Sequence, residues 1–145
     1  MAISVGRPSG ELTRCGGKWT EAFFVNFVKN QLRSATRKWA PIQQCKKVNK
    51  VGYGEYKCEC CRDVVPPTIF DPDKGKRVTN VFVDHIRPVV DPEVGFISWD
   101  SFINGLFCEA DNLQLLCRKC HDLKTREEID VAKERRLKEK NKNAK

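Results

Sequence analysis

The sequence predicts a small α+β domain stabilised by a bound metal ion, and three observations support that fold class. An amphipathic helical pattern covers about residues 20–39, and a β-branched and aromatic run covers residues 77–83. Two C-x-x-C pairs lie at residues 58–61 and 117–120. Only 40% of the 145 residues are hydrophobic and 32% are charged, so the apolar core is limited and metal ligation can supply further stability.

The charge is unevenly distributed and indicates three segments. Residues 1–50 hold ten basic and two acidic residues, a net charge of +8, whereas residues 51–121 carry −3 and residues 122–145 carry +3. We expect a basic N-terminal extension over residues 1–50, a core over 51–125 and a basic C-terminal tail over 126–145. The overall charge of +8 favours a polyanionic partner, and nucleic acid is the first candidate.

Membrane and secretory signals are not evident in the sequence. No apolar run approaches the roughly 18 residues that cross a bilayer, and the longest, residues 22–28, is interrupted by Asn26. Residues 1–10 lack the basic and apolar regions of a signal peptide. We therefore expect a cytoplasmic protein without membrane association. In such a reducing compartment, the eight cysteines indicate metal binding rather than a disulfide framework.

The N-terminal segment is expected to be irregular through Gly17 and to continue into a helix. Thr20 is a suitable N-cap, and Glu21 suits the first helical turn. Pro41 is expected to end the helix at or just after Trp39, because the residue before a proline avoids helical geometry. The apolar side chains of this helix recur at three- and four-residue spacing and are Phe23, Phe24, Phe27, Val28, Leu32, Ala35 and Trp39.

The remaining elements are shorter. We expect a strand at residues 77–83, a helix at 98–107, a second strand at about 112–117 and a helix from about 118 to 138. The last helix has a thin apolar stripe, so its end is expected to fray. Packing is the expected role of the aromatic residues Phe96, Trp99, Phe102 and Phe107.

The two C-x-x-C pairs predict a zinc site with the ligands Cys58, Cys61, Cys117 and Cys120. Two intervening residues let one tight turn present both sulfurs to an ion about 2.3 Å away, and two such turns complete a tetrahedral site. Four protein ligands leave no open position, so this zinc would be structural. The alternative interpretation is a set of small, buried apolar cysteines.

The other four cysteines are weaker candidates. Cys60 lies between the members of the first pair and is an alternative ligand, although Cys58 and Cys61 have the better spacing. Cys15, Cys45 and Cys108 have no partner at a ligand spacing, and we expect them to be free or buried thiols.

The chain has two histidines, and both follow other candidate residues. His85 follows Asp84 at the end of the expected first strand, and His121 directly follows Cys120. A single histidine is more often structural than catalytic. Zinc bound to both cysteine pairs would bring these two histidines together beside a carboxylate, which is a more informative arrangement.

Two segments resemble the HNH endonuclease family, in its subtype with two zinc knuckles. They are Val-Asp-His-Ile-Arg-Pro at 83–88 and Asp-Asn-Leu-Gln-Leu-Leu-Cys-Arg-Lys-Cys-His-Asp-Leu-Lys-Thr at 111–125. The pair at 58–61 matches the first knuckle of that subtype. The resemblance covers about residues 56–125, or half of the chain, and leaves residues 1–50 outside it.

The resemblance implies a ββα-metal (His-Me finger) core around one catalytic divalent ion. The strands would be at about 78–85 and 112–117, and the helix would begin near Arg118. The implied activity is metal-dependent hydrolysis of a DNA phosphodiester to 5′-phosphate and 3′-hydroxyl ends. Nicking is the default for one active site on one chain, because cutting both strands needs two sites or a reorientation.

The resemblance also implies roles for individual residues. His85 resembles the general base, and an imidazole suits this role because it can take up a proton near neutral pH. Asp84 and His121 resemble the ligands of a catalytic Mg²⁺ or Mn²⁺ ion, which would stabilise charge on the phosphate and on the leaving oxygen. Asn112 resembles the residue that holds the loop and orients the base. Asn104 is a competing asparagine without the matching sequence context.

One departure from the family is the 26 residues between His85 and Asn112, which exceed a minimal motif. Small proteins of this kind are common in bacteriophages, so a phage origin and a packaging terminase or other phage protein as a partner follow by analogy only. The alternative function is a zinc-stabilised, non-catalytic DNA-binding module. It would need none of Asp84, His85 and His121.

Double-stranded DNA is the expected partner, and basic residues are the expected backbone contacts. Those beside the proposed site are Arg87, Arg118, Lys119 and Lys124. Those on the first helix are Arg33, Arg37 and Lys38, and those on the last helix are Lys133, Arg135 and Arg136. A solvated charged surface is the alternative interpretation of each.

Overall fold

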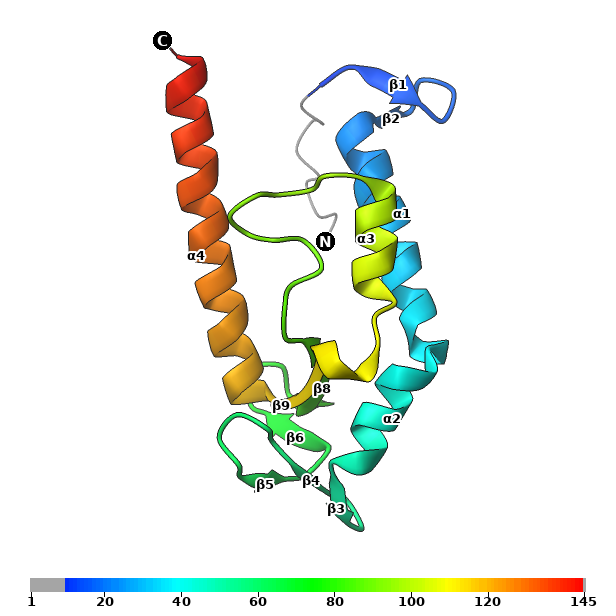
Figure 1. Ribbon diagram of the computed structural model, residues 1–145, viewed down its shortest axis with the longest axis vertical. Helices are drawn as coiled ribbons and strands as arrows, with labels where there is room; N and C mark the ends of the chain where they lie inside the picture. Colours follow the sequence, from blue (N-terminus) through cyan, green and yellow to red (C-terminus); the bar gives the residue numbers. More distant parts are fainter. Residues whose placement is uncertain (1–9, 145) are drawn as a thin grey trace. The chain divides into compact units, whose positions relative to one another are not determined.

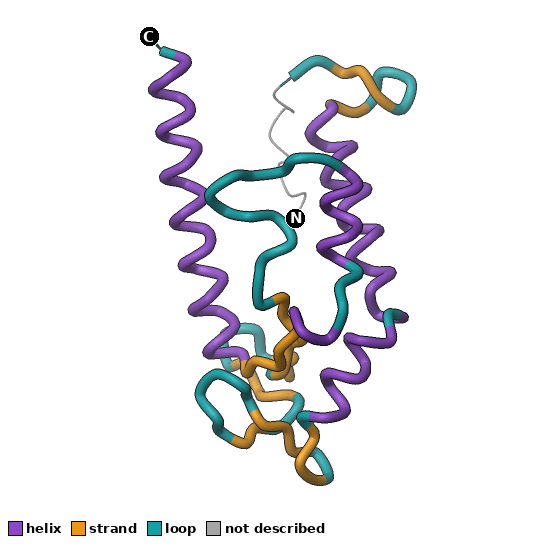
Figure 2. The backbone as a smooth tube through the Cα atoms, viewed as in Figure 1, coloured by secondary structure: helices purple, strands orange, loops and turns teal. Residues whose placement is uncertain are grey.

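The computed structural model describes residues 10–144 and has an α+β fold, as the sequence predicts (Figure 1). The chain divides into two compact units between Arg37 and Lys38. Figure 2 shows the helices and the short strands along the backbone, and six strands follow one another between α2 and α3. Residues 1–9, which begin the segment expected to be irregular, lie outside the described residues.

The first unit contains a short hairpin and a helix. These elements are β1 (Leu12–Arg14), β2 (Trp19–Thr20) and α1 (Glu21–Ala35). Thr20 is the N-cap of α1, as predicted, because its hydroxyl accepts a hydrogen bond from the Phe23 amide at 3.2 Å. The Trp19 ring contacts the rings of Phe23 and Phe27, with centroids 4.8 and 5.0 Å apart.

The expectation of an irregular segment through Gly17 is wrong for its second half. β1 and β2 pair in antiparallel fashion, and the turn between them is made by Cys15, Gly16 and Gly17 in left-handed conformations. Glycine adopts these conformations without steric cost. The glycines therefore reverse the chain instead of leaving it without structure.

The helix predicted over residues 20–39 is interrupted, and a further helix follows it. α1 ends at Ala35, a 3-10 turn spans Thr36–Lys38, and α2 spans Ala40–Val48. Pro41 stands in the first turn of α2, where its missing N–H has no intrahelical acceptor to lose. The sequence prediction takes Pro41 only as the end of a helix and therefore misses α2.

α2 belongs to the second unit because of its packing. Ile42 and Cys45 on α2 contact Leu113 and Leu115. The units accordingly divide before α2, whereas the charge distribution places a segment boundary at residue 50. Charged residues face solvent and do not mark where a compact unit begins, because the boundary of a unit is set by its apolar packing.

Within residues 38–144 the strands form three small antiparallel sheets. The first contains β3 (Lys50–Gly52), β4 (Glu55–Lys57) and β5 (Val64–Val65). The second pairs β6 (Thr68–Asp71) with β7 (Lys76–Thr79), and the third pairs β8 (Val81–His85) with β9 (Leu113–Cys117).

The single strand predicted to begin at residue 77 is divided at Asn80. Its amide donates to the Pro67 carbonyl at 2.8 Å, and its side chain donates to the Pro66 carbonyl at 2.9 Å. The Asn80 carbonyl accepts from the Arg118 amide at 2.9 Å. These bonds replace strand-ladder bonds, so β7 pairs with β6 and β8 pairs with β9.

The core of the second unit surrounds β9. His85 on β8 lies opposite Leu113, and Val81 lies opposite Cys117. Successive strand side chains point to opposite faces, and both faces of β9 are covered. Leu113 and Leu115 on one face pack with Cys45 and Val81, and Leu116 on the other face packs in the cluster of Cys58 and Cys117, where Cys117 is the last residue of the strand.

α3 (Trp99–Leu106) confirms the helix predicted over residues 98–107. It begins after Ser98, whose hydroxyl accepts a hydrogen bond from the Ser101 amide at 3.1 Å. Phe102 on α3 is buried. The aromatic residues pack as expected, with ring contacts of Phe96 with Trp99, Trp99 with Phe102, and Trp39 with Phe107.

α4 (Arg118–Asn143) begins where the sequence predicts and runs beyond the expected end near Lys138. Lysine and glutamate have favourable helix propensities, which accounts for the extension. The guanidinium of Arg135 on α4 lies directly against Gly95, where any side chain would overlap it. Among residues 10–144, no helix has both the length and the apolar character that a membrane span requires.

Replacing Leu115 with alanine should lower the free energy of unfolding of the second unit by about 2–5 kcal/mol, because the truncation leaves a cavity in the core. Leu115 is 0% exposed. Urea denaturation followed by circular dichroism measures the change. Val48→Ala is the control, since Val48 is 65% exposed and its loss should change stability by less than about 0.5 kcal/mol. Equal losses of stability in the two variants would contradict the placement of Leu115 in the core.

Candidate functional site

Four cysteine side chains from two distant segments meet at one point in the second unit. The sulfur atoms of Cys58, Cys61, Cys117 and Cys120 all lie within 4.8 Å of one another. Tetrahedral zinc with Zn–S bonds of about 2.3 Å places its sulfurs about 3.8 Å apart, and the Sγ atoms of Cys61 and Cys117 are 3.9 Å apart. The group predicted from the C-x-x-C spacing can therefore hold a metal ion such as zinc.

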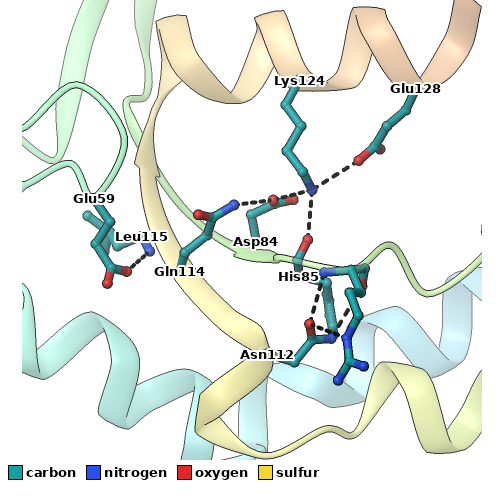
Figure 3. Close-up of polar contacts among 9 residues, drawn as sticks. Glu59, Asp84, His85, Asn112, Gln114, Leu115, Lys124 and Glu128 are labelled. Atoms are coloured by element: carbon teal, nitrogen blue, oxygen red, sulfur yellow. Dashed lines mark hydrogen bonds and ion pairs between the residues drawn. The ribbon is translucent and has the colours of Figure 1, made fainter.

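Glu59 holds the first cysteine pair against β9. Its amide donates to the Leu115 carbonyl at 2.9 Å, and its carboxylate accepts from the Leu115 amide at 2.5 Å (Figure 3). Arg62 adopts a left-handed φ of 67°, which lets the chain turn so that the Cys58 amide reaches the Asp63 carbonyl at 3.0 Å. This local turn and its contact with β9 position the thiols.

The second cysteine pair lies at the start of α4, where Cys117 precedes the first helical residue. Burial raises the pKa of Cys58, but hydrogen bonds from the amides of Cys117, Cys61 and Cys60 outweigh it and bring this pKa to about 7. Burial raises the pKa of Cys120 to about 12. Zinc must displace the remaining thiol protons, so zinc affinity should fall as the pH falls.

The remaining cysteines lie outside this four-sulfur group. Cys60 and Cys15 are exposed, Cys108 is partly buried, and all are free thiols. Cys45 lies in the core beside Leu115, and burial raises its pKa to about 11. These positions agree with the expectation of free or buried thiols.

Cys58→Ser and Cys117→Ser should each release the bound zinc and lower the melting temperature of the second unit, because three thiolates hold zinc less tightly than four. Zinc per chain, measured by mass spectrometry, and a thermal melt test this expectation. Cys60→Ser is the matched control and should keep one zinc and the wild-type melt. Tight zinc retention in Cys58→Ser would remove Cys58 from the ligand set.

The second group of candidate residues lies at the end of β8 (Figure 3). The Lys124 ammonium is 2.6 Å from the Asp84 carboxylate and donates to the His85 carbonyl at 2.7 Å. It is also 2.9 Å from Glu128, and Gln114 donates to the same Asp84 oxygen at 3.3 Å. Burial lowers the pKa of Lys124, but the bonds to Asp84 and Glu128 outweigh it and hold this pKa above its ordinary value.

Asn112 holds the chain that follows β8. Its side-chain oxygen accepts from the Arg87 amide at 2.8 Å, and its side-chain nitrogen donates to the Arg87 carbonyl at 3.2 Å. Its own carbonyl accepts from the Ile86 amide at 2.8 Å. Asn104, the competing asparagine, lies on α3 and lines a hollow of about 400 Å³ together with Asn112. Asn112, rather than Asn104, makes the hydrogen bonds to Arg87.

The hydrogen bond of the His85 ring defines its tautomer. Nε2 is 2.9 Å from the carbonyl oxygen of Leu106. A carbonyl oxygen only accepts, so Nε2 must carry the hydrogen. A neutral His85 therefore has its lone pair on Nδ1, and no residue in 10–144 hydrogen-bonds that atom.

His121 lies in the first turn of α4 and stacks on the Phe82 ring, with centroids 4.3 Å apart. Its Nδ1 is buried without a hydrogen-bond partner in the described part of the chain and is 3.7 Å from an Asp122 oxygen. The four cysteines are the only group of three or more potential metal ligands found among residues 10–144. Asp84 and His121 thus belong to no such group.

The predicted DNA-contacting residues have different surroundings. Lys119 and Arg87 are exposed, whereas Lys124 is engaged by Asp84. Arg118 donates to the Thr79 carbonyl at 2.9 Å. Exposed positions at and after the end of α1 hold Arg33, Arg37 and Lys38.

Three residues of these sites are absent from the sequence prediction. Gln114 lies opposite Asp84 in the β8–β9 register, and Glu128 is four residues after Lys124, so helix and strand periodicity could have indicated both. Glu59 lies within the first cysteine pair, and no pattern in the sequence indicates its bonds to Leu115.

The chain matches no protein-family model, no curated protein and no solved structure. The residues of the two sites and their geometry therefore carry the functional conclusion.

Proposed function

We propose that the chain is a zinc-stabilised, metal-dependent DNA endonuclease of the HNH type that nicks one strand of a duplex. The observation that supports this most directly is the Asp84–His85 pair, held by Lys124 at the end of β8 beside the loop that Asn112 holds. A carboxylate and an imidazole in a fixed position are side chains that can serve phosphodiester hydrolysis.

His85 is the proposed general base. Its Nδ1 would accept a proton from water as the water oxygen attacks phosphorus, while Nε2 stays bonded to the Leu106 carbonyl. The bond from phosphorus to the 3′ oxygen breaks, and that oxygen takes up a proton from solvent. The products carry a 5′-phosphate and a 3′-hydroxyl. The Leu106 bond supports this role because it orients the ring.

Asp84 and His121 are the proposed ligands of a catalytic Mg²⁺ or Mn²⁺ ion. Their donor atoms suit such an ion, and the buried Nδ1 of His121 has no hydrogen-bond partner within residues 10–144. A bound ion would stabilise negative charge on the phosphate and on the leaving oxygen. Lys124 holds the Asp84 carboxylate, so it must move or share that carboxylate when the ion binds.

The cysteine group has a structural role in this proposal. Four thiolates would complete the tetrahedral coordination of zinc and leave no position for a substrate. The group joins the first cysteine pair to the start of α4, where His121 directly follows Cys120. The net charge of +8 supports duplex DNA as the partner.

A second candidate function is a zinc-stabilised DNA-binding module without catalytic activity, such as an accessory protein of phage DNA packaging. The 2.6 Å ion pair between Lys124 and Asp84 favours it, because a carboxylate that already has a cation does not require a metal. The two candidates differ in whether His85 and His121 are needed for anything beyond folding.

His85→Ala and His121→Ala should each lower the rate of plasmid nicking with Mg²⁺ or Mn²⁺ by about 100-fold or more, because the first removes the base that activates water and the second removes a ligand of the catalytic ion. Conversion of supercoiled to open-circular plasmid measures the rate. Thr125→Ala on the exposed side of α4 is the control and should nick like wild type.

The comparison also requires that both histidine variants keep the wild-type melt and DNA affinity. If they fold, bind DNA and still cut at the wild-type rate, the proposed site is wrong. If the zinc-loaded wild type binds DNA and nicks with neither ion, the non-catalytic module is the better conclusion.

Lys124→Met should raise the affinity for Mn²⁺ several-fold, because the ion would no longer compete with an ammonium group 2.6 Å from the Asp84 oxygen. Electron paramagnetic resonance of free Mn²⁺ measures the affinity without DNA. Glu128→Gln leaves the contact between Lys124 and Asp84 in place and should have a smaller effect. Unchanged affinity in Lys124→Met would contradict Asp84 as a ligand.

A further inference from the structure

Four basic side chains form a row along the exposed side of α4. They recur every seven residues, at Lys119, Arg126, Lys133 and Lys140. Residues seven apart on an α-helix differ by only about 20° around its axis. The row therefore turns by about 60° in total while it extends for about 31 Å along the helix.

The row is free of internal partners, whereas two cations on the opposite face of α4 are paired. All four side chains are exposed, and none forms an ion pair or hydrogen bond with another residue in 10–144. On the inner face, Lys124 pairs with Glu128 and Arg135 pairs with Glu139. Arg135, which the sequence predicts to contact DNA, lies against Gly95.

Acidic residues of α4 flank the row on both sides. By helical geometry, Asp130 lies between Arg126 and Lys133 on one side, with Glu127 and Glu134 farther round the helix, and Asp122 lies between Lys119 and Arg126 on the other side. Asp122 lies near the start of the row, 3.7 Å from the His121 ring. The row is therefore a line of spaced cations with Asp122 and Asp130 beside it, and the segment over residues 122–145 has a net charge of +3.

We propose that this row is a docking surface for the phosphate backbone of duplex DNA. The proposal rests on the proposed function only in taking DNA as the partner. Cations about 10 Å apart along a slowly turning row suit a linear polyanion that carries a charge about every 1.7 Å of its axis. The row begins two residues before His121 in the chain, and helical geometry places it on the face of α4 opposite Lys124.

The exposed apolar residues of α4 favour DNA over a membrane surface. Leu123, Ile129 and Leu137 are exposed, but each is more than one helical turn from the next. A helix that lies in a membrane interface needs a continuous apolar face. Isolated apolar side chains between regularly spaced cations do not provide one.

Binding of a fluorescein-labelled DNA duplex, measured by fluorescence anisotropy without added Mg²⁺ or Mn²⁺, tests the row independently of cleavage. The row variant is Arg126→Glu with Lys133→Glu. The matched control is Lys138→Glu with Lys142→Glu, which changes the net charge equally at positions off the row. The row variant should bind about tenfold more weakly, and the slope of log affinity against log salt should fall by about 2. The control should lose less than about threefold.

Equal losses in the two variants would overturn the proposal, because net charge alone would then explain binding. Unchanged affinity in the row variant, or a wild type that binds no duplex, would overturn it as well. Loss of binding to phosphatidylserine vesicles, with DNA binding retained, would assign the row to membranes instead. Wild-type protein that binds through the row but never nicks would support the row and contradict the nuclease.

Circular dichroism establishes whether the glutamate variants keep the helix. If they do not, Arg126→Gln with Lys133→Gln repeats the comparison, because glutamine keeps a high helix propensity. Its matched control is Lys138→Gln with Lys142→Gln. The proposal is supported if the glutamine row variant binds DNA more weakly than its control, even by a smaller factor than the glutamate variants show. Equal DNA affinity of the two glutamine variants overturns it.

Discussion

The antiparallel pairing of β9 with β8 is the contact on which both candidate sites depend. Along one edge of β9, this pairing places Asp84 opposite Gln114. Along the other edge, Leu115 bonds Glu59 and so holds the first cysteine pair. The chain passes from β9 directly into α4 at Cys117. A shift of one residue in register would turn every side chain of β9 to the opposite face and separate the two sites.

Lys124 is the residue on which the chemistry of the second site depends. A partly buried carboxylate needs a cation, and Lys124 supplies one to both Asp84 and Glu128 while also bonding the His85 carbonyl. The same contacts have two opposite effects. They fix the Asp84–His85 pair in one position, and they occupy the carboxylate that a divalent ion would use. If a divalent ion can displace Lys124 from Asp84, the site suits a nuclease. If it cannot, the site suits a binding module.

Features that depend on short-range spacing were predictable from the sequence alone. Two intervening residues place both thiols of each C-x-x-C pair in one turn, so each pair of ligands followed from its own spacing, although the meeting of the two pairs did not. Thr20 and Ser98 begin helices because a hydroxyl at the N-cap reaches a free amide a few residues ahead. The α+β class and the start of α4 followed from the change between periods of two and 3.6 residues.

Only the tertiary structure decided which distant groups meet. Pro41 suits the end of one helix and the first turn of another equally well, and packing of α2 on β9 selected the second use. Asn80 ends one strand pair because the carbonyls of Pro66 and Pro67 lie beside it. Lys124 reaches Asp84 across 40 residues of chain. The sequence by itself thus determined the ligand types and the local turns, whereas closure of the chain around β9 decided their partners, because such contacts depend on positions in space rather than on spacing along the chain.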